Sequence, residues 1–427
     1  MLKKEQNDLI TRTGPNTAMG DLFRRYWIPA LLAEELPAND CPPVRVKLLS
    51  ERLVAFRDSK GRLGLIDEFC AHRGASLWFG RNEKCGLRCP YHGWKFDVTG
   101  QCVEVPSEPV ESKFADKIKL KSYPLVERGG VLWTYMGPIE HQPPLPEWEF
   151  ATVPPKHRFI SKRFQECNYL QAMEGGIDSS HVSFLHSGNL ESDPLFKGAK
   201  GNKYNLSDMQ PHFEVVESPG GLYIGARRNA ENGNYYWRIT QWVMPSFTMV
   251  PPRGTYSVHG HFWIPIDDEN CWAWSYDYHP TRELTDAEVE AMKQGKGVHV
   301  KHVPGTYRPL ANKDNDYLMD REAQRRGTTY SGVEGIAIQD GSLQESMGPI
   351  VDRTKENLVS TDNGIIMARH RLMRAAKELA KGVRPPGVEP AHQKVRSASV
   401  ILPADQPFKD AAREALTVRK GVAPASV

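Results

Sequence analysis

Alternating apolar and polar positions in the first third of the chain predict several short β-strands. Residues 44–56, VRVKLLSERLVAF, read as two strands around a charged turn, and residues 63–66 form another apolar run. A proline-rich segment, residues 138–155, follows this region. Because each proline removes a backbone donor and resists regular structure, we expect a linker there. The pattern predicts a small β domain before the linker and a second domain after it.

The second domain mixes β-like and helical patterns. Residues 271–278 place aromatic side chains on alternate positions, hence on one face of a strand, and residues 235–244 are similarly β-like. Residues 284–332 are polar and irregular, which favours a surface excursion. Apolar residues over 364–381 have helical spacing, so we predict a closing helix there and an extended arm over 383–427. These patterns alone indicate an α+β fold.

Composition narrows the class of function. The chain of 427 residues is 40% hydrophobic and 25% charged, as in soluble globular proteins. Its formal net charge of +3 is too small to indicate binding to nucleic acid or to an anionic membrane. The first residues lack a signal-like apolar region, and no apolar run reaches the roughly 18 residues that a membrane span needs. We therefore expect a cytoplasmic protein whose cysteines stay reduced and can bind metal.

Two pairs of cysteine and histidine form the most specific motif of the chain. Cys70-x-His72 is followed after sixteen residues by Cys89-x2-His92, and each pair lies in a glycine-containing loop. A Rieske 2Fe-2S cluster takes two cysteines on one iron and two histidines on the other, so the pattern predicts such a cluster. The alternative is a structural zinc site, although zinc sites more often pair cysteine with cysteine and histidine with histidine.

A second motif contains two further histidines. Four polar residues that precede or form it are spaced for one face of a helix: Gln171, Glu174, Asp178 and His181. His186 follows five residues after His181. Such a pair is by itself more often a solvent-facing or core pair. Two neutral imidazoles and one carboxylate, however, leave open positions on a ferrous ion for O2 and substrate, so we predict a mononuclear Fe(II) site.

The carboxylate of this iron site must come from further along the chain. Residues 332–353 contain three candidates: Asp340, Glu345 and Asp352. Asp352 stands beside Arg353 and fits a surface ion pair better. Spacing alone does not choose among them.

The motifs CAHRG, residues 70–74, and CPYHGW, residues 89–94, resemble the signature of Rieske non-haem iron aromatic ring-hydroxylating oxygenases. The pattern Asp178-x2-His181-x4-His186 is similar to the iron-ligand motif of the same family. The resemblance runs from the opening residues to about Leu379. It is greatest to the phthalate dioxygenase group, which includes chlorobenzoate and phenoxybenzoate dioxygenases and O-demethylases of lignin-derived biphenyl acids.

The resemblance implies a domain organisation. Residues 41–137 would form a β-rich Rieske 2Fe-2S domain, and residues 138–155 the linker. Residues 156–382 would form a catalytic domain of the helix-grip (START-like) fold, an antiparallel sheet wrapped on helices. Residues 1–40 would pack with that catalytic domain.

The resemblance also implies roles for single residues. Asp340 would be the third iron ligand, with Glu345 as the reserve candidate. Asp178 would not bind iron, but would bridge His181 to His92 of a neighbouring subunit. This arrangement gives electrons a short route and implies a homotrimer or stacked trimers.

Members of this group accept aromatic carboxylates, so the resemblance implies an aromatic acid and O2 as substrates. Electrons would come from NAD(P)H through a separate flavin and iron–sulfur reductase. Because arginine grips a carboxylate best, the candidate partners are Arg227, Arg228 and Arg238, although each also fits an outward-facing strand residue. The candidates for an aromatic pocket wall are Trp237, Trp242, Phe247, Trp272 and Trp274, although aromatic strand residues more often belong to the core.

Two other classes of function stay open at this point. One is a Rieske electron carrier without its own catalytic iron, which the long region beyond the linker disfavours. The other is a zinc-stabilised binding protein. For an oxygenase, the sequence does not choose between ring hydroxylation and O-demethylation.

Overall fold

The computed structural model describes residues 1–427, apart from the side chain of Val110. The chain divides into two compact units. The larger unit contains residues 1–13, 17–22 and 144–427, and the smaller unit contains residues 14–16 and 23–143. Among the described residues, no helix has the length and apolar character that crossing a bilayer requires.

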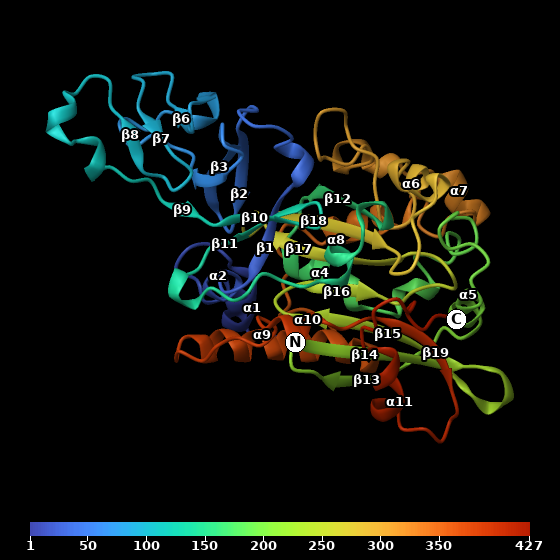
Figure 1. The fold of residues 1–427 in the computed structure, drawn as a ribbon. Helices are drawn as coiled ribbons and strands as arrows, with labels where there is room; N and C mark the ends of the chain where they lie inside the picture. Colours follow the sequence, from blue (N-terminus) through green and yellow to red (C-terminus); the bar gives the residue numbers. More distant parts are fainter. The chain divides into compact units, whose positions relative to one another are not determined.

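The smaller unit is a β structure of short antiparallel strands (Figure 1). One sheet contains β2 (Val44–Leu48), β3 (Glu51–Arg57), β4 (Leu63–Asp67) and β9 (Ser122–Tyr123). A second contains β5 (Arg81–Glu83), β6 (Gly86–Arg88), β7 (Lys95–Phe96) and β8 (Cys102–Glu104). A third contains β1 (Trp27–Leu32), β11 (Val131–Tyr135) and β10 (Leu125–Arg128). The strands predicted over 44–56 and 63–66 are confirmed.

The larger unit is built on one antiparallel sheet in the order β12-β18-β17-β16-β15-β14-β13, with β19 paired to β15. Its strands are β12 (Arg158–Gln165), β13 (His212–Glu217), β14 (Gly221–Asn229), β15 (Tyr235–Val243), β16 (Phe247–Val250), β17 (Val258–Pro265), β18 (Cys271–Tyr278) and β19 (Ala398–Leu402). Both strands predicted over 235–244 and 271–278 are confirmed.

Helices pack on this sheet, so the fold is α+β, as predicted. The α-helices are α1 (Lys4–Thr11), α2 (Ala18–Phe23), α3 (Glu149–Thr152), α4 (Tyr169–Ile177), α5 (Gly201–Ser207), α6 (Asp286–Lys293), α7 (Arg321–Arg326), α8 (Ile336–Ser346), α9 (Asn363–Leu379), α10 (Pro390–Gln393) and α11 (Phe408–Ala415). The closing helix predicted over 364–381 is α9, which packs against β13 and β14.

Helix α4 lies close to the sheet and to α8, and this packing positions the site. α4 contacts β16, β17 and α8. A Cβ atom at Gly176 would meet the Trp263 ring nitrogen at 3.0 Å, so glycine allows the close approach. The helix predicted to continue to His181 ends at Ile177. Two consecutive glycines, Gly175 and Gly176, weaken the last turn, and Asp178 has an extended backbone.

Two segments at the ends of the predicted catalytic domain also differ from expectation. Residues 398–402 form β19 rather than part of an extended arm, and pair with β15. Phe408 of α11 then stacks on Trp237 with ring centroids 4.2 Å apart. The proline-rich segment contains α3 and a fully buried Trp148, 1% exposed. In both segments, burial of aromatic and aliphatic side chains outweighs a local composition typical of loops.

The N-terminal segment is divided between the two units. Residues 1–13 and 17–22 belong to the larger unit, while residues 23–40 belong to the smaller one. The reason is local: β1, residues 27–32, pairs with β11 and is buried along its whole length. The sequence analysis assigned all of residues 1–40 to the catalytic domain, whereas only residues 1–13 and 17–22 belong to that unit.

Candidate active site and metal centres

Two loops of the smaller unit contain the predicted cluster residues. Cys70 follows β4 and Cys89 follows β6, and each begins a tight turn that ends at a glycine. The Gly74 N–H donates to the Cys70 carbonyl at 2.9 Å, and the Gly93 N–H donates to the Cys89 carbonyl at 3.0 Å. Both glycines have positive φ, 76° and 79°, which residues with a Cβ rarely adopt. The two turns therefore share one geometry.

These turns bury the sulfurs and expose the imidazoles. Cys70 and Cys89 are 3% and 2% exposed, whereas His72 and His92 are exposed and their Nδ1 atoms lie 3.1 Å apart. Burial, with the Cys89 sulfur beside it, raises the pKa of the Cys70 thiol to about 11, so a metal ion is needed to hold it as a thiolate. Two buried thiols and two exposed imidazoles match the donor set of a Rieske cluster.

The second motif meets α8 in the larger unit. His181 begins a 3-10 turn just after α4, His186 follows it, and Asp340 lies on α8. The Nε2 atoms of the two histidines are 3.1 Å apart, and Asp340 Oδ1 lies 3.5 Å from His181 Nε2 and 3.2 Å from His186 Nε2. Two imidazoles and one carboxylate thus converge on one point, a donor set that suits a ferrous ion with open positions.

Hydrogen bonds behind these side chains fix their orientation. Asp178 Oδ2 lies 3.1 Å from His181 Nδ1, and Gln339 Oε1 lies 2.8 Å from His186 Nδ1. The Gln339 amide in turn donates to Asn189 Oδ1 at 2.7 Å. Both histidines therefore present Nε2 to the same point. The sequence analysis did not find Gln339, although its place beside Asp340 on a helix is a usable signal.

The electrostatics of the two carboxylates follow from their partners. Burial alone would raise the pKa of Asp340, but His186 and His181 outweigh it and lower this pKa to about 2. For Asp178, burial again acts to raise the pKa, and the hydrogen bond and charge of His181 hold it below the usual value. Both groups are therefore carboxylates at neutral pH.

The three converging side chains line a cavity. Its apolar wall consists of Val182, Phe196, Val250, Trp263, Val298 and Ile336. Its other polar residues are Asp178, Arg238, Arg253, His259 and His261. A cavity that combines an apolar wall with convergent polar groups is typical of a site for a small organic molecule.

Only one of the three predicted arginines reaches this cavity. Arg238 lines it and is 5% exposed. Arg228 is fully buried elsewhere and donates to the carbonyls of Asp208 and Ser179. Arg227 stacks over the Tyr235 ring at 4.0 Å. Neighbouring residues of a strand point to opposite faces of the sheet, so Arg227 and Arg228 cannot both face the side on which Arg238 lies.

Of the two interpretations of the aromatic strand residues, the structure favours core over pocket wall. None of Trp237, Trp242, Phe247, Trp272 and Trp274 is among the described cavity residues. Trp242, for example, donates to the Met173 sulfur in the core. The cavity instead uses Phe196 and Trp263.

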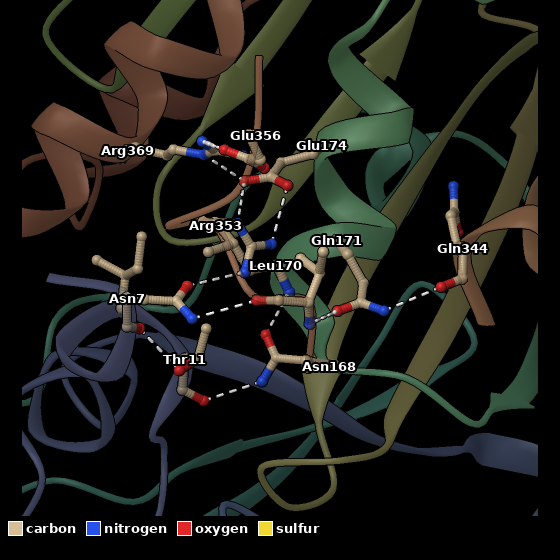
Figure 2. A network of polar contacts seen from close by, with 12 residues as sticks. Asn7, Thr11, Asn168, Leu170, Gln171, Glu174, Gln344, Arg353, Glu356 and Arg369 are labelled. Atoms are coloured by element: carbon tan, nitrogen blue, oxygen red, sulfur yellow. Dashed lines mark hydrogen bonds and ion pairs between the residues drawn. The ribbon is translucent and has the colours of Figure 1, made fainter. Parts of the chain in front are cut away.

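The remaining carboxylate candidates point away from the two histidines. Glu345 lies on α8 with Asp340, but it accepts hydrogen bonds from the Tyr317 hydroxyl at 2.5 Å and the Glu166 amide at 3.0 Å. Asp352 pairs with Lys355 at 3.0 Å and is largely exposed. Glu174 belongs to the separate polar network drawn in Figure 2.

Comparison with known proteins places the chain in a family. Residues 26–124 match the model described as Rieske [2Fe-2S] domain, and residues 134–421 match the model described as LigXa C-terminal domain like. The fold and the two donor sets therefore define a Rieske non-haem iron oxygenase. The chain belongs to the family whose Rieske domain is followed by a LigXa-like C-terminal domain.

Individual relatives agree with this assignment. The chain is 37% identical to a 3-chlorobenzoate-3,4-dioxygenase oxygenase subunit of Comamonas testosteroni, over 92% of this chain and 93% of the relative. It is 36% identical to a phthalate 4,5-dioxygenase oxygenase subunit of Pseudomonas putida, over 90% and 88%. It is 31% identical to a 5,5'-dehydrodivanillate O-demethylase oxygenase subunit of a Sphingobium species, over 98% and 90%.

A solved structure supports the fold. A crystal structure of dicamba monooxygenase bound to dicamba matches with a TM-score of 0.58 at 19% identity, over 84% of this chain and 99% of that chain.

The two family matches and the relatives together define the class of enzyme. The chain is an oxidoreductase, the terminal oxygenase of a Rieske oxygenase system, with a 2Fe-2S cluster and a mononuclear non-haem iron as cofactors. The zinc-binding and electron-carrier alternatives are set aside.

Proposed function

We propose that this oxygenase oxidises an aromatic carboxylic acid with O2. The observation that carries the proposal is a buried arginine in the cavity of the converging histidines. Arg238 donates to the Ser179 hydroxyl at 2.9 Å and has no carboxylate partner among the described residues. Burial, followed by the charge of nearby Arg253, lowers the pKa of Arg238 to about 9. A substrate carboxylate would supply the missing negative charge.

We assign the mononuclear iron to His181, His186 and Asp340, and the 2Fe-2S cluster to the loops at 70–74 and 89–94. The distances among the three side chains and the paired turns support this assignment. When bound, the ferrous ion supplies the position at which O2 and substrate meet. The chain itself orients the two imidazoles through Asp178 and Gln339, and its apolar wall excludes bulk water from the aromatic ring.

Asp178 has a second proposed role in electron transfer between subunits. One carboxylate oxygen faces His181 Nδ1, and the other accepts the Ser180 N–H at 2.7 Å. The residue is half-buried and lines the cavity. We infer that it hydrogen-bonds His92 of the partner subunit in a homotrimer or stacked trimers, which are supplied with electrons by a separate NAD(P)H-dependent flavin and iron–sulfur reductase.

Two reactions fit this site. Ring hydroxylation is the first candidate, since the two relatives of highest identity above are named dioxygenases of 3-chlorobenzoate and phthalate. O-demethylation is the second, since the 5,5'-dehydrodivanillate relative is named an O-demethylase.

The test is turnover of a panel of aromatic acids with reductase and NADH. The panel contains phthalate, chlorobenzoates and methoxybenzoates, with the matching amides as uncharged controls. A diol or phenol product indicates hydroxylation, and formaldehyde with a demethylated phenol indicates O-demethylation. Inactivity on every acid, in protein that contains both metal centres by metal analysis and electron paramagnetic resonance, would reject the substrate class.

A further inference from the structure

Strand β17 presents two histidines to the cavity from the sheet side. His259, His261 and Trp263 alternate along the strand, so their side chains lie on one face, and all three line the cavity. The two histidines are 3% and 7% exposed. No motif in the sequence analysis used them, and they are not among the three side chains that converge on the metal position.

Both histidines are neutral at physiological pH. Burial, ahead of any charge effect, lowers the pKa of His259 to about 4 and that of His261 to about 3. Arg253 and Arg238 add to the effect at His259, and Arg163 adds to it at His261, while Asp277 at His259 and Asp340 at His261 act in the opposite direction. A neutral imidazole offers one donor and one acceptor nitrogen.

The two rings differ in how their nitrogens are used. His261 Nδ1 lies 3.1 Å from the Ser275 hydroxyl. His259 Nδ1 is buried and has no hydrogen-bond partner among the described residues. A buried polar atom left without a partner costs free energy comparable to a lost hydrogen bond, so it calls for a partner from a ligand or water.

Arg253 Nε, in the same cavity lining, is likewise buried without a partner among the described residues. The polar groups across the sheet from His259 pair with one another rather than with its ring. Its cross-strand neighbour Asp277 has a partner on each oxygen: Oδ1 accepts from the Ser257 hydroxyl at 2.5 Å, and Oδ2 lies 2.9 Å from His299 Nε2. His299 in turn lies 2.7 Å from the Ser161 hydroxyl. Asp277 and its partners Ser257 and His299 thus leave His259 Nδ1 without a hydrogen bond, while the His259 ring lines the cavity.

The cavity thus combines two kinds of recognition. Arg238 and Arg253 provide positive charge for a carboxylate. His259 provides an uncharged imidazole, which can hydrogen-bond a neutral group of the substrate. We propose that His259 is a specificity-determining residue that hydrogen-bonds a neutral oxygen substituent, a hydroxyl or alkoxy group, on the aromatic acid. The inference rests on the proposed function and deepens it: the substrate class becomes hydroxylated or alkoxylated aromatic acids.

The experiment is equilibrium binding to the iron-loaded holoenzyme without O2 or reductant, measured by calorimetry. The probes are hydroxy- and methoxybenzoates substituted at each ring position, each compared with the methylbenzoate of the same position. For at least one position, we expect the oxygen-bearing acid to bind about tenfold more tightly than its methyl counterpart. Equal affinities at every position in the wild-type protein would overturn the inference without any variant.

Variants then locate the effect. His259→Leu should remove the preference while changing methylbenzoate affinity less than about threefold, and His259→Gln, which keeps a hydrogen-bonding amide, should restore part of it. His370→Leu, at an exposed position of α9, is the matched control and should keep the full preference. A preference that survives in folded His259→Leu protein would assign it to another group. If no benzoate binds at all, the proposed substrate class fails, which is a different result.

Discussion

The two halves of the polar segment 171–181 have opposite surroundings. In the first half, Glu174 accepts hydrogen bonds from two buried arginines, Arg353 at 2.9 Å and Arg369 at 2.7 Å (Figure 2). In the second half, Asp178 and His181 face the cavity and the converging metal-ligand atoms. One continuous sequence pattern therefore contributes to a structural network at one end and to the active site at the other.

The difference teaches that spacing identifies polar positions but not their partners. The break after Ile177 rotates Asp178 and His181 away from the face that carries Gln171 and Glu174. Gln171 donates instead to the carbonyls of Gln344 and Gly348. The first half should therefore control folding, and the second half should control metal binding and turnover.

The largest effect is expected at the carboxylate that completes the site. Asp340→Ala removes one of three converging donors, so we expect loss of the mononuclear iron and a fall in turnover of more than about a thousandfold, with the 2Fe-2S signal unchanged. Iron analysis and electron paramagnetic resonance measure both centres. Glu345→Gln is the control on the same helix and should retain the iron. If Glu345→Gln loses iron and Asp340→Ala does not, the third ligand is misassigned.

The next effect is expected at the proposed bridge. Asp178→Asn keeps the shape of the side chain but removes its charge, so both metal centres should remain while turnover falls by about 100-fold. Oxidation of the reduced cluster in the substrate-bound protein, measured by stopped-flow spectroscopy, should become slower to the same extent. Full activity of the Asp178→Asn protein would contradict the bridge role. Asp178 would then have a structural role, like Glu174 in the first half of the segment.

A smaller effect is expected at the cationic side of the cavity. Arg238→Gln removes a charge-assisted hydrogen bond to the substrate, so KM for the aromatic acid should rise by about 10- to 100-fold with a smaller change in kcat. Steady-state kinetics with acid and amide substrates separate the charge effect from a packing defect. Arg227→Gln, outside the cavity, is the matched control and should leave KM within about twofold. An equal loss for acid and amide would contradict carboxylate recognition by Arg238.

The parts of the site that the sequence predicted are those encoded within short segments. Each cysteine–histidine pair lies in one turn, so its spacing identifies it. His181 and His186 lie in one short segment, and the cysteine–histidine motif beside them made the iron-site interpretation the favoured one. Asp340 comes from a distant helix, and only family resemblance selected it over Glu345. Its position results from the packing of α8 against α4, which no local pattern encodes.

The sequence analysis missed the cavity residues on the sheet, because the sequence does not show which face of a strand meets the cavity. His259 and Arg253 lie in or beside β17, where the pattern His-x-His-x-Trp was visible but the direction of the face was not. The predicted aromatic wall failed for the same reason, because burial in the core and lining of a cavity produce the same alternation. Likewise, the paired glycines before Asp178 were the available signal for the end of α4.

The smallest effect on turnover, with the largest on folding, is expected at Glu174. Glu174→Gln removes the negative charge that two buried arginines share. The free energy of unfolding should therefore fall by about 3 kcal/mol, while the folded protein keeps its turnover within about twofold. Burial would raise the pKa of Glu174, but Arg353 and Arg369 outweigh it and hold the pKa below its ordinary value. Its contribution to stability is therefore present above the ordinary pKa of a glutamate in the unfolded chain and is lost as the pH falls through the lowered folded-state pKa. Urea denaturation of wild type and variant should converge in acid. Glu217→Gln, at a partly exposed pair, should cost less than about 1 kcal/mol. A turnover defect in folded Glu174→Gln protein would show that the two halves of the segment are coupled.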